Sequence, residues 1–108
     1  MRRLEVLAYL VVREGNDRGK QVALGRQNVV VGRSLKSALQ LSDETVSRQH
    51  ARLEYEAGSH VIVDLGSTNG TFVNGKRVDR RRLSPGDRIV LGRTRLVYQA
   101  GKALDLAQ

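Results

Sequence analysis

Short apolar runs alternate with turn residues along almost the whole chain, and this pattern is the main signal for the fold. Valine, isoleucine and leucine dominate the runs, and the β-branched residues among them favour strands. The runs expected to form strands are residues 4–13, 21–24, 28–31, 38–41, 50–56, 60–65, 71–73, 76–78, 88–91 and 94–99. No run sustains the spacing of a long amphipathic helix. Many short strands with frequent turns predict an all-β domain, built as an antiparallel sandwich or barrel.

Turn-forming residues mark the places where the chain is expected to reverse. Asn74-Gly75 separates two of the runs, and this dipeptide is the strongest short signal for a β-hairpin. Residues 57–59 form a second compact connection, and residues 84–87 hold the only proline of the chain in a third turn. Neighbouring strands are therefore expected to pair as hairpins.

The length of the chain fits a single domain. It has 108 residues, of which 40% are hydrophobic, and this is enough to close one core. Aromatic residues make up only 4%, so the core must consist mainly of valine, leucine and isoleucine. We expect a folded domain over residues 1–100 and a C-terminal tail over residues 101–108.

An excess of basic residues narrows the class of partner. The chain has 19 Lys+Arg against 11 Asp+Glu, which gives a formal net charge of +8. Such a charge favours an anionic partner, a class that includes nucleic acid, a membrane surface and a phosphorylated protein. Charge alone does not choose among them.

The chain has no cysteine, so neither a disulfide framework nor a thiolate metal site is expected. This composition fits the reducing cytoplasm, or the nucleus in a eukaryote. The N-terminal apolar run is interrupted by Glu5 and lacks a small-residue cleavage site, which argues against a signal peptide. The run is also too short to span a bilayer, so we expect no membrane insertion.

Three polar segments carry the candidate chemistry: residues 29–34 (VVVGRS), residues 45–50 (TVSRQH) and residues 64–75 (DLGSTNGTFVNG). Together they supply what a phosphate ester needs. The guanidinium of Arg33 offers a planar fork of donors, and the hydroxyl of Ser47 adds a compact one. Glycines allow loop N–H groups to approach a ligand closely, and the amide of Asn69 can hold a peptide backbone.

In this order and spacing, the three segments resemble the forkhead-associated (FHA) domain family over about residues 4–99. The resemblance implies a β-sandwich of about eleven strands whose apical loops bind phosphothreonine peptides. It assigns contacts with the phosphate or the peptide to these residues: Arg33, Ser47, Arg48, Thr68 and Asn69. It gives a supporting role to Gly32, His50 and Gly70, with His50 bracing the loops.

Other chemistries suggested by the same residues are rejected. Ser47 and His50 are not expected to form a hydrolytic pair, because an i, i+3 pair entering a strand places its side chains on opposite faces. Residues 70–76 fit part of a phosphate-loop pattern, but Arg77 stands where Ser or Thr should follow and no helix is predicted. With only two histidines and no thiol, a metal site is not expected. Residues 80–82, three arginines, are interpreted as a solvated basic edge.

The sequence therefore predicts a non-catalytic module that binds a threonine-phosphorylated protein downstream of a Ser/Thr kinase. No cofactor and no small-molecule substrate are expected. Two alternatives remain open at this point: a nucleic-acid-binding β-domain, favoured by the positive charge, and a scaffold that binds partners without phosphorylation. The lack of aromatic interleaving or a docking helix in the basic segments disfavours nucleic acid.

Overall fold

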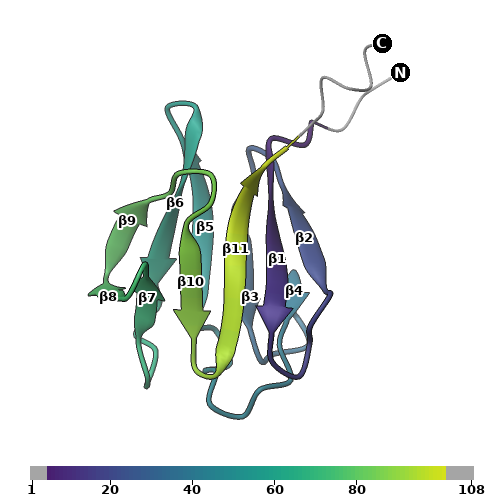
Figure 1. Cartoon of the computed structure of the whole chain (residues 1–108), viewed down its shortest axis with the longest axis vertical. Helices are drawn as coiled ribbons and strands as arrows, with labels where there is room; N and C mark the ends of the chain where they lie inside the picture. Colours follow the sequence, from purple (N-terminus) through teal and green to yellow (C-terminus); the bar gives the residue numbers. More distant parts are fainter. Residues whose placement is uncertain (1–4, 102–108) are drawn as a thin grey trace.

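The computed structural model describes residues 5–101, which form two β-sheets packed face to face (Figure 1). The six-stranded sheet has the order β2 (Gln21–Leu24), β1 (Ala8–Glu14), β11 (Thr94–Ala100), β10 (Arg88–Leu91), β7 (Thr71–Val73) and β8 (Lys76–Val78). The five-stranded sheet has the order β4 (Leu39–Gln40), β3 (Val29–Gly32), β5 (Ala51–Glu56), β6 (Ser59–Asp64) and β9 (Arg80–Arg82). The predicted all-β sandwich is confirmed.

The core lies between the sheets and follows from the alternation of side chains along each strand. In β1, Ala8, Leu10 and Val12 are 1% exposed and face the other sheet, whereas Tyr9 and Val11 face outward. The buried hydrophobic residues of the core are mainly leucine, valine and isoleucine, as the composition predicted. These aliphatic residues fill most of the space between the two sheets, and Tyr98 is the one aromatic residue of the core cluster.

Several strand boundaries and one pairing differ from the sequence predictions, and the largest boundary change is at the first strand. The first strand begins at Ala8 rather than at residue 4. The strand pairing with β2 and β11 starts there, where Ala8 lies opposite Leu24 and Ala100. The short strand β4 pairs with β3 in parallel, so the five-stranded sheet is mixed rather than wholly antiparallel. Residues 1–4, and residues 102–108 of the expected tail at 101–108, lie outside the described part of the chain.

The segment interpreted as a solvated basic edge is mostly exposed at the edge of a sheet, as expected, and it also forms a strand, β9, that was not predicted. It pairs antiparallel with β6, and its first arginine, Arg80, is bound to Glu54 at 3.2 Å and to Glu56 at 2.8 Å. Short runs of charged residues carry no hydrophobic alternation, so local pattern does not reveal such a strand. β9 forms because the unpaired edge of β6 supplies backbone hydrogen-bond partners for it.

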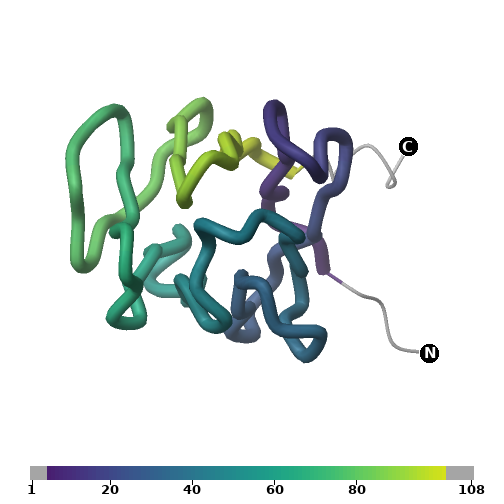
Figure 2. Tube along the Cα trace, turned by 90° about the horizontal axis from the view of Figure 1, so that it is seen from below, coloured from purple at the N-terminus to yellow at the C-terminus, as the bar shows by residue number. Residues whose placement is uncertain are grey.

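The connections that contain the three polar segments gather at one end of the sandwich. They are the β3–β4 loop (residues 33–38), the β4–β5 loop (residues 41–50) and the β6–β7 loop (residues 65–70), and Figure 2 looks onto this end. The two ends of the described chain lie side by side at the opposite end, where Gly101 N donates to Leu7 O at 2.8 Å. Within residues 5–101, no helix is long and apolar enough to cross a membrane.

The predicted hairpin at Asn74-Gly75 joins β7 to β8, and it supplies a test of the fold. Asn74 has φ 50° and Gly75 has φ 85°, the left-handed pair that a tight hairpin requires. No atom lies within 4 Å of a side-chain carbon built on Gly75, so replacing it strains the backbone alone.

Gly75→Val should therefore destabilise the domain by about 1–2 kcal/mol, because a β-branched residue disfavours positive φ, and lower Tm by about 5 °C or more. Gly75→Asn, which tolerates the left-handed region, should lower Tm by less. Thermal unfolding followed by circular dichroism measures both. An unchanged Tm for the valine variant would contradict the hairpin geometry.

Candidate functional site

Gly32 allows the end of β3 to contact the β4–β5 loop. A side-chain carbon on Gly32 would overlap the carbonyl oxygen of Arg48, so only glycine fits there. The close approach lets Arg33 N donate to Ser47 O at 3.0 Å and Ser34 N donate to Arg48 O at 3.1 Å. Residues separated by more than ten positions in the sequence are thereby fixed side by side.

The side chain of Arg33 is anchored at one nitrogen and open at the others. Its Nε donates to the carbonyl oxygen of Val46 at 3.0 Å, which fixes the direction of the guanidinium. Within residues 5–101, its two terminal nitrogens have no protein hydrogen-bond partner, and the residue is exposed. Arg33 therefore presents an oriented, permanently charged pair of donors to solvent.

Ser47 links the β4–β5 loop to the β6–β7 loop. Its Oγ accepts a hydrogen bond from the backbone N–H of Thr68 at 3.0 Å, so the hydroxyl proton is free to donate to a ligand. Asn69 makes the next link by donating from Nδ2 to Thr45 O at 2.8 Å. Its side-chain oxygen then remains available to accept a bond from a peptide N–H group.

His50 is fully buried beneath these loops and joins them. Its Nδ1 accepts a bond from the backbone N–H of Ser47 at 3.1 Å, so the ring proton is on Nε2, which donates to Gly70 O at 2.8 Å. The expectation that the Ser47 and His50 side chains lie on opposite faces is therefore too simple, because the ring turns back toward the serine backbone. The serine hydroxyl does not contact the ring and is bonded to Thr68 N instead.

Gly70 lies where the backbone adopts a left-handed conformation that favours glycine. It has φ 89°, and a side-chain carbon there would lie 2.8 Å from Nε of Arg77. The glycine lets the β6–β7 loop turn tightly into β7 while its carbonyl still meets His50.

Two aspartates, Asp43 and Asp64, fix the conformation of the loops, and neither is among the site residues predicted from the sequence. Asp43 accepts bonds from Thr45 N at 2.8 Å and Thr94 Oγ1 at 2.9 Å, which tie the β4–β5 loop to β11. Asp64 accepts bonds from Gly66 N at 3.0 Å and Thr71 Oγ1 at 2.7 Å, which close the β6–β7 loop. An aspartate followed two or three residues later by Ser, Thr or Gly is a local turn signal that points to this role.

The hydrogen bonds to Asp64 also determine its ionisation. Burial alone would raise the pKa of the Asp64 carboxyl, but hydrogen bonds from the side chains of Ser67 and Thr71 outweigh it. The pKa therefore lies below its ordinary value of 3.8. The charged form is the one that holds the loop.

The residues predicted to bind a ligand converge on one open hollow of about 350 Å³ at the loop end. Its lining comprises Arg33, Glu44, Thr45, Val46, Ser47, Arg48, Thr68 and Asn69. All five predicted contact residues are present, and the supporting residues lie behind them. Glu44 is the one acidic residue of the lining. Its carboxylate disfavours an acidic ligand group directly beside it. The hollow offers oriented cationic and neutral donors around a space large enough for a tetrahedral oxyanion.

Asp64 gives a prediction about pH. Because its folded pKa is lowered, its contribution to stability is complete above about pH 4, its unfolded value, and is lost as the pH falls through the folded pKa. Asp64→Asn should lower the free energy of unfolding at pH 7 by about 1–3 kcal/mol, the cost of unsatisfied donors. The gap between the variant and the original chain should narrow at pH 3.

Urea unfolding at the two pH values measures this gap, and Asp79→Asn, at an exposed aspartate, is the matched control. An equal effect of Asp64→Asn at pH 7 and pH 3 would show that the charge of Asp64 does not hold the loop.

Comparison with known sequences places this loop architecture in a family. The FHA domain model matches residues 29–92. The glycogen accumulation regulator GarA of Mycolicibacterium smegmatis is 41% identical over 98 residues, which cover 91% of this chain and 62% of the relative. The oxoglutarate dehydrogenase inhibitor of Corynebacterium glutamicum is 40% identical over 96 residues, covering 89% of this chain and 67% of the relative. The chain thus spans about 60–70% of the length of these relatives.

Solved structures agree with the sequences. An FHA domain studied for its phosphothreonine-dependent interactions has a TM-score of 0.80 at 30% identity, covering 86% of this chain and 95% of that one. The FhaA FHA domain, solved with the intracellular domain of Rv3910, has a TM-score of 0.79 at 30% identity, with coverages of 85% and 99%. The chain belongs to the forkhead-associated (FHA) domain family.

Proposed function

We propose that this domain binds a phosphothreonine-containing segment of a partner protein in the hollow at its loop end. The observation that carries the proposal is the convergence of unused donors from Arg33 and Ser47 with the β6–β7 turn at Thr68 and Asn69. All are held by buried or backbone hydrogen bonds, so little side-chain freedom is lost when a ligand binds.

The chemistry of the donors favours a phosphorylated over an unmodified residue. A phosphothreonine carries about −1.5 to −2 charges near neutral pH, whereas threonine carries none. A charge-assisted hydrogen bond from Arg33 or Ser47 contributes about 1.5–3 kcal/mol. Two such bonds separate the modified from the unmodified peptide by about a hundredfold or more.

The remaining lining residues fit roles in holding the peptide. The free side-chain oxygen of Asn69 is suited to accept a backbone N–H of the ligand, which would fix its register. Arg48 is exposed beside Ser47, where it can contact the phosphate or a flanking residue. Gly32, His50 and Gly70 act indirectly by holding the loops in position.

The relatives support this function and its setting. One solved FHA domain was studied for phosphothreonine-dependent interactions, and Mycobacterium tuberculosis EmbR was solved with a low-affinity phosphopeptide. The sequence relatives are named as a regulator and as an inhibitor, not for a catalytic activity of their own. We infer a cytoplasmic, non-catalytic adaptor that reads the output of a Ser/Thr kinase and needs no cofactor. One feature argues against a serine hydrolase: Ser47 Oγ accepts a hydrogen bond from Thr68 N instead of donating to His50.

Arg33→Ala tests the site. The variant should keep the fold, since the side chain is exposed, yet weaken binding of a phosphothreonine peptide by about tenfold or more. Isothermal titration calorimetry with a phosphothreonine-oriented peptide measures the loss, and thermal unfolding checks the fold. Arg82→Ala, at an exposed arginine of β9, removes the same charge away from the hollow and should bind normally.

Two results would overturn the proposal. Equal affinity of the original chain for phosphorylated and unphosphorylated peptide would favour a scaffold that ignores phosphorylation. Equal losses in Arg33→Ala and Arg82→Ala would mean that overall charge, rather than the hollow, attracts the peptide.

A further inference from the structure

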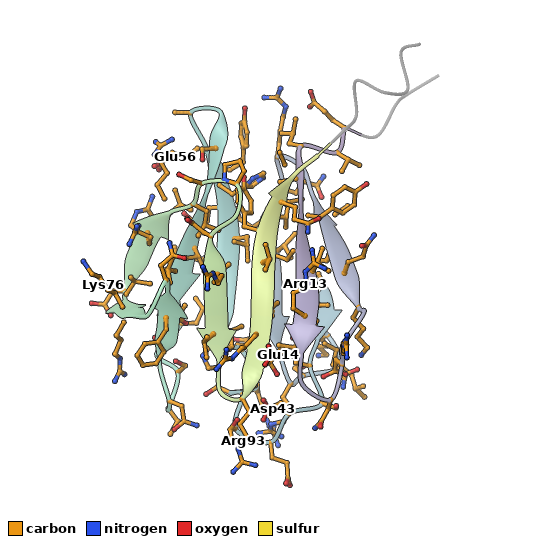
Figure 3. The ribbon with its side chains drawn as sticks, in the orientation of Figure 1. Arg13, Glu14, Asp43, Glu56, Lys76 and Arg93 are labelled. Carbon is orange, nitrogen blue, oxygen red and sulfur yellow. The ribbon has the colours of Figure 1, made fainter. Side chains whose placement is uncertain are left out.

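The outer face of the six-stranded sheet carries a second hollow, larger than the one at the loop end. It has a volume of about 640 Å³, and its lining includes Arg13, Arg88, Val90, Arg95 and Val97. The valines lie half-buried on adjacent strands, and the arginines surround them. Figure 3 looks onto this face, with Arg13 near its centre. The hollow joins an apolar floor to a rim of three arginines and one carboxylate, Glu14.

The arginines of the two outer faces differ in their partners. On the five-stranded sheet, Arg52 is paired with Glu54 at 2.8 Å and Arg80 is paired with both Glu54 and Glu56, whereas the exposed Arg82 has no ion pair among the described residues. On the six-stranded sheet, the only ion pair found within residues 5–101 joins Arg95 to Glu14 at 3.6 Å, and both side chains are 66% exposed.

Arg13 and Arg88 have no carboxylate within ion-pair distance in the described part of the chain. The positive charge of the outer face is therefore mostly uncompensated. A single exposed pair such as Arg95–Glu14 contributes little and gives way easily to a better partner.

A third hollow adjoins the loop-end hollow. It has a volume of about 210 Å³, and its lining is Gly15, Asn16, Asp43, Glu44, Thr45 and Arg93. It shares Glu44 and Thr45 with the loop-end hollow, and Gly15 follows Glu14 of the outer face. In Figure 3, Arg93, Asp43, Glu14 and Arg13 follow one another from the loop end onto the sheet.

We propose that the outer face of the six-stranded sheet binds an acidic, partly apolar segment of the same polypeptide that carries the phosphothreonine. The proposal rests on the phosphothreonine function stated above. Carboxylates of the segment would pair with Arg13, Arg88 and Arg95, and its apolar side chains would cover Val90 and Val97. An extended segment of about twelve residues spans about 40 Å, close to the 43 Å long axis of the molecule.

Charge and composition favour a polypeptide over the other possible occupants. A second copy of this chain would place one basic face against another, which is repulsive. Nucleic acid offers phosphates but no apolar side chains for the valine floor, and single strands are bound through stacked aromatic residues. Tyr9 and Phe72 are the aromatic residues on this face among those described, and neither lines the hollow. An acidic segment with alternating apolar residues complements both the floor and the rim.

Calorimetry with three phosphothreonine peptides tests the proposal. The first is short, the second adds a twelve-residue extension of alternating Glu and Val, and the third adds a neutral extension of alternating Ser and Gly. Extensions on either side of the phosphothreonine are made separately. The Glu–Val extension on one of the two sides should raise affinity by about tenfold over the short peptide, and the neutral extension should not.

Two charge reversals locate the effect. Arg88→Glu should abolish the gain from the acidic extension while leaving affinity for the short phosphopeptide unchanged. Arg82→Glu is the matched control, because Arg82 is also an exposed strand arginine but belongs to the other sheet. It should retain the gain. Equal loss in the two variants would overturn the proposal, because it would indicate attraction to net charge alone, and so would equal gains from the acidic and neutral extensions.

A second measurement separates this proposal from the phosphothreonine function. The unphosphorylated Glu–Val peptide is titrated into ¹⁵N-labelled protein, and the perturbed backbone amides should lie on β1, β10 and β11. If the short phosphopeptide fails to bind but these amides shift, the loop site is wrong and the outer face stands. Shifts confined to the loops, no shifts at millimolar peptide, or displacement of the peptide by a random DNA duplex would overturn the outer-face proposal.

Discussion

The binding end of this domain depends on one buried side chain, His50. Its ring accepts a bond from the Ser47 backbone and donates one to the Gly70 carbonyl, so two loops that are remote in sequence share a single fixed partner. A buried ring nitrogen that loses its hydrogen-bond partner destabilises the fold, so the two hydrogen bonds of His50 favour one relative position of the two loops. The placement of Ser47 against Thr68, and of Asn69 against Thr45, follows from this link.

The sandwich and its loops have separate tasks. The strands bury a core of aliphatic side chains that fixes where each loop begins and ends. The loops keep their polar groups near the surface and are stiffened from behind by Asp43 and Asp64, whose carboxylates replace the strand partners that loop N–H groups lack. A rigid framework with oriented, solvent-facing donors suits recognition of a charged group, since the ligand need not order the site.

The net positive charge is distributed unevenly, and the distribution matters more than the total. The outer face of the five-stranded sheet pairs Arg52 and Arg80 with glutamates. The loop end holds Arg33 and Arg48 around one hollow, and the six-stranded sheet presents a further basic face with an apolar floor. The net charge of +8 is thus distributed over one surface where two of the arginines are paired with glutamates and two surfaces where most arginines are unpaired.

The local pattern of the sequence determined the strands, the Asn74-Gly75 hairpin and the three loop segments, because alternation, turn preference and motif spacing act over a few residues. The family resemblance then predicted the contact residues and the bracing role of His50. Only the tertiary structure revealed the parallel β3–β4 pair, the strand β9 and the clamps made by Asp43 and Asp64. It also decided which arginines are neutralised, because Arg80 meets Glu54 across strands more than twenty residues apart. Such pairings depend on the register between distant strands, a long-range property that no short stretch of sequence contains.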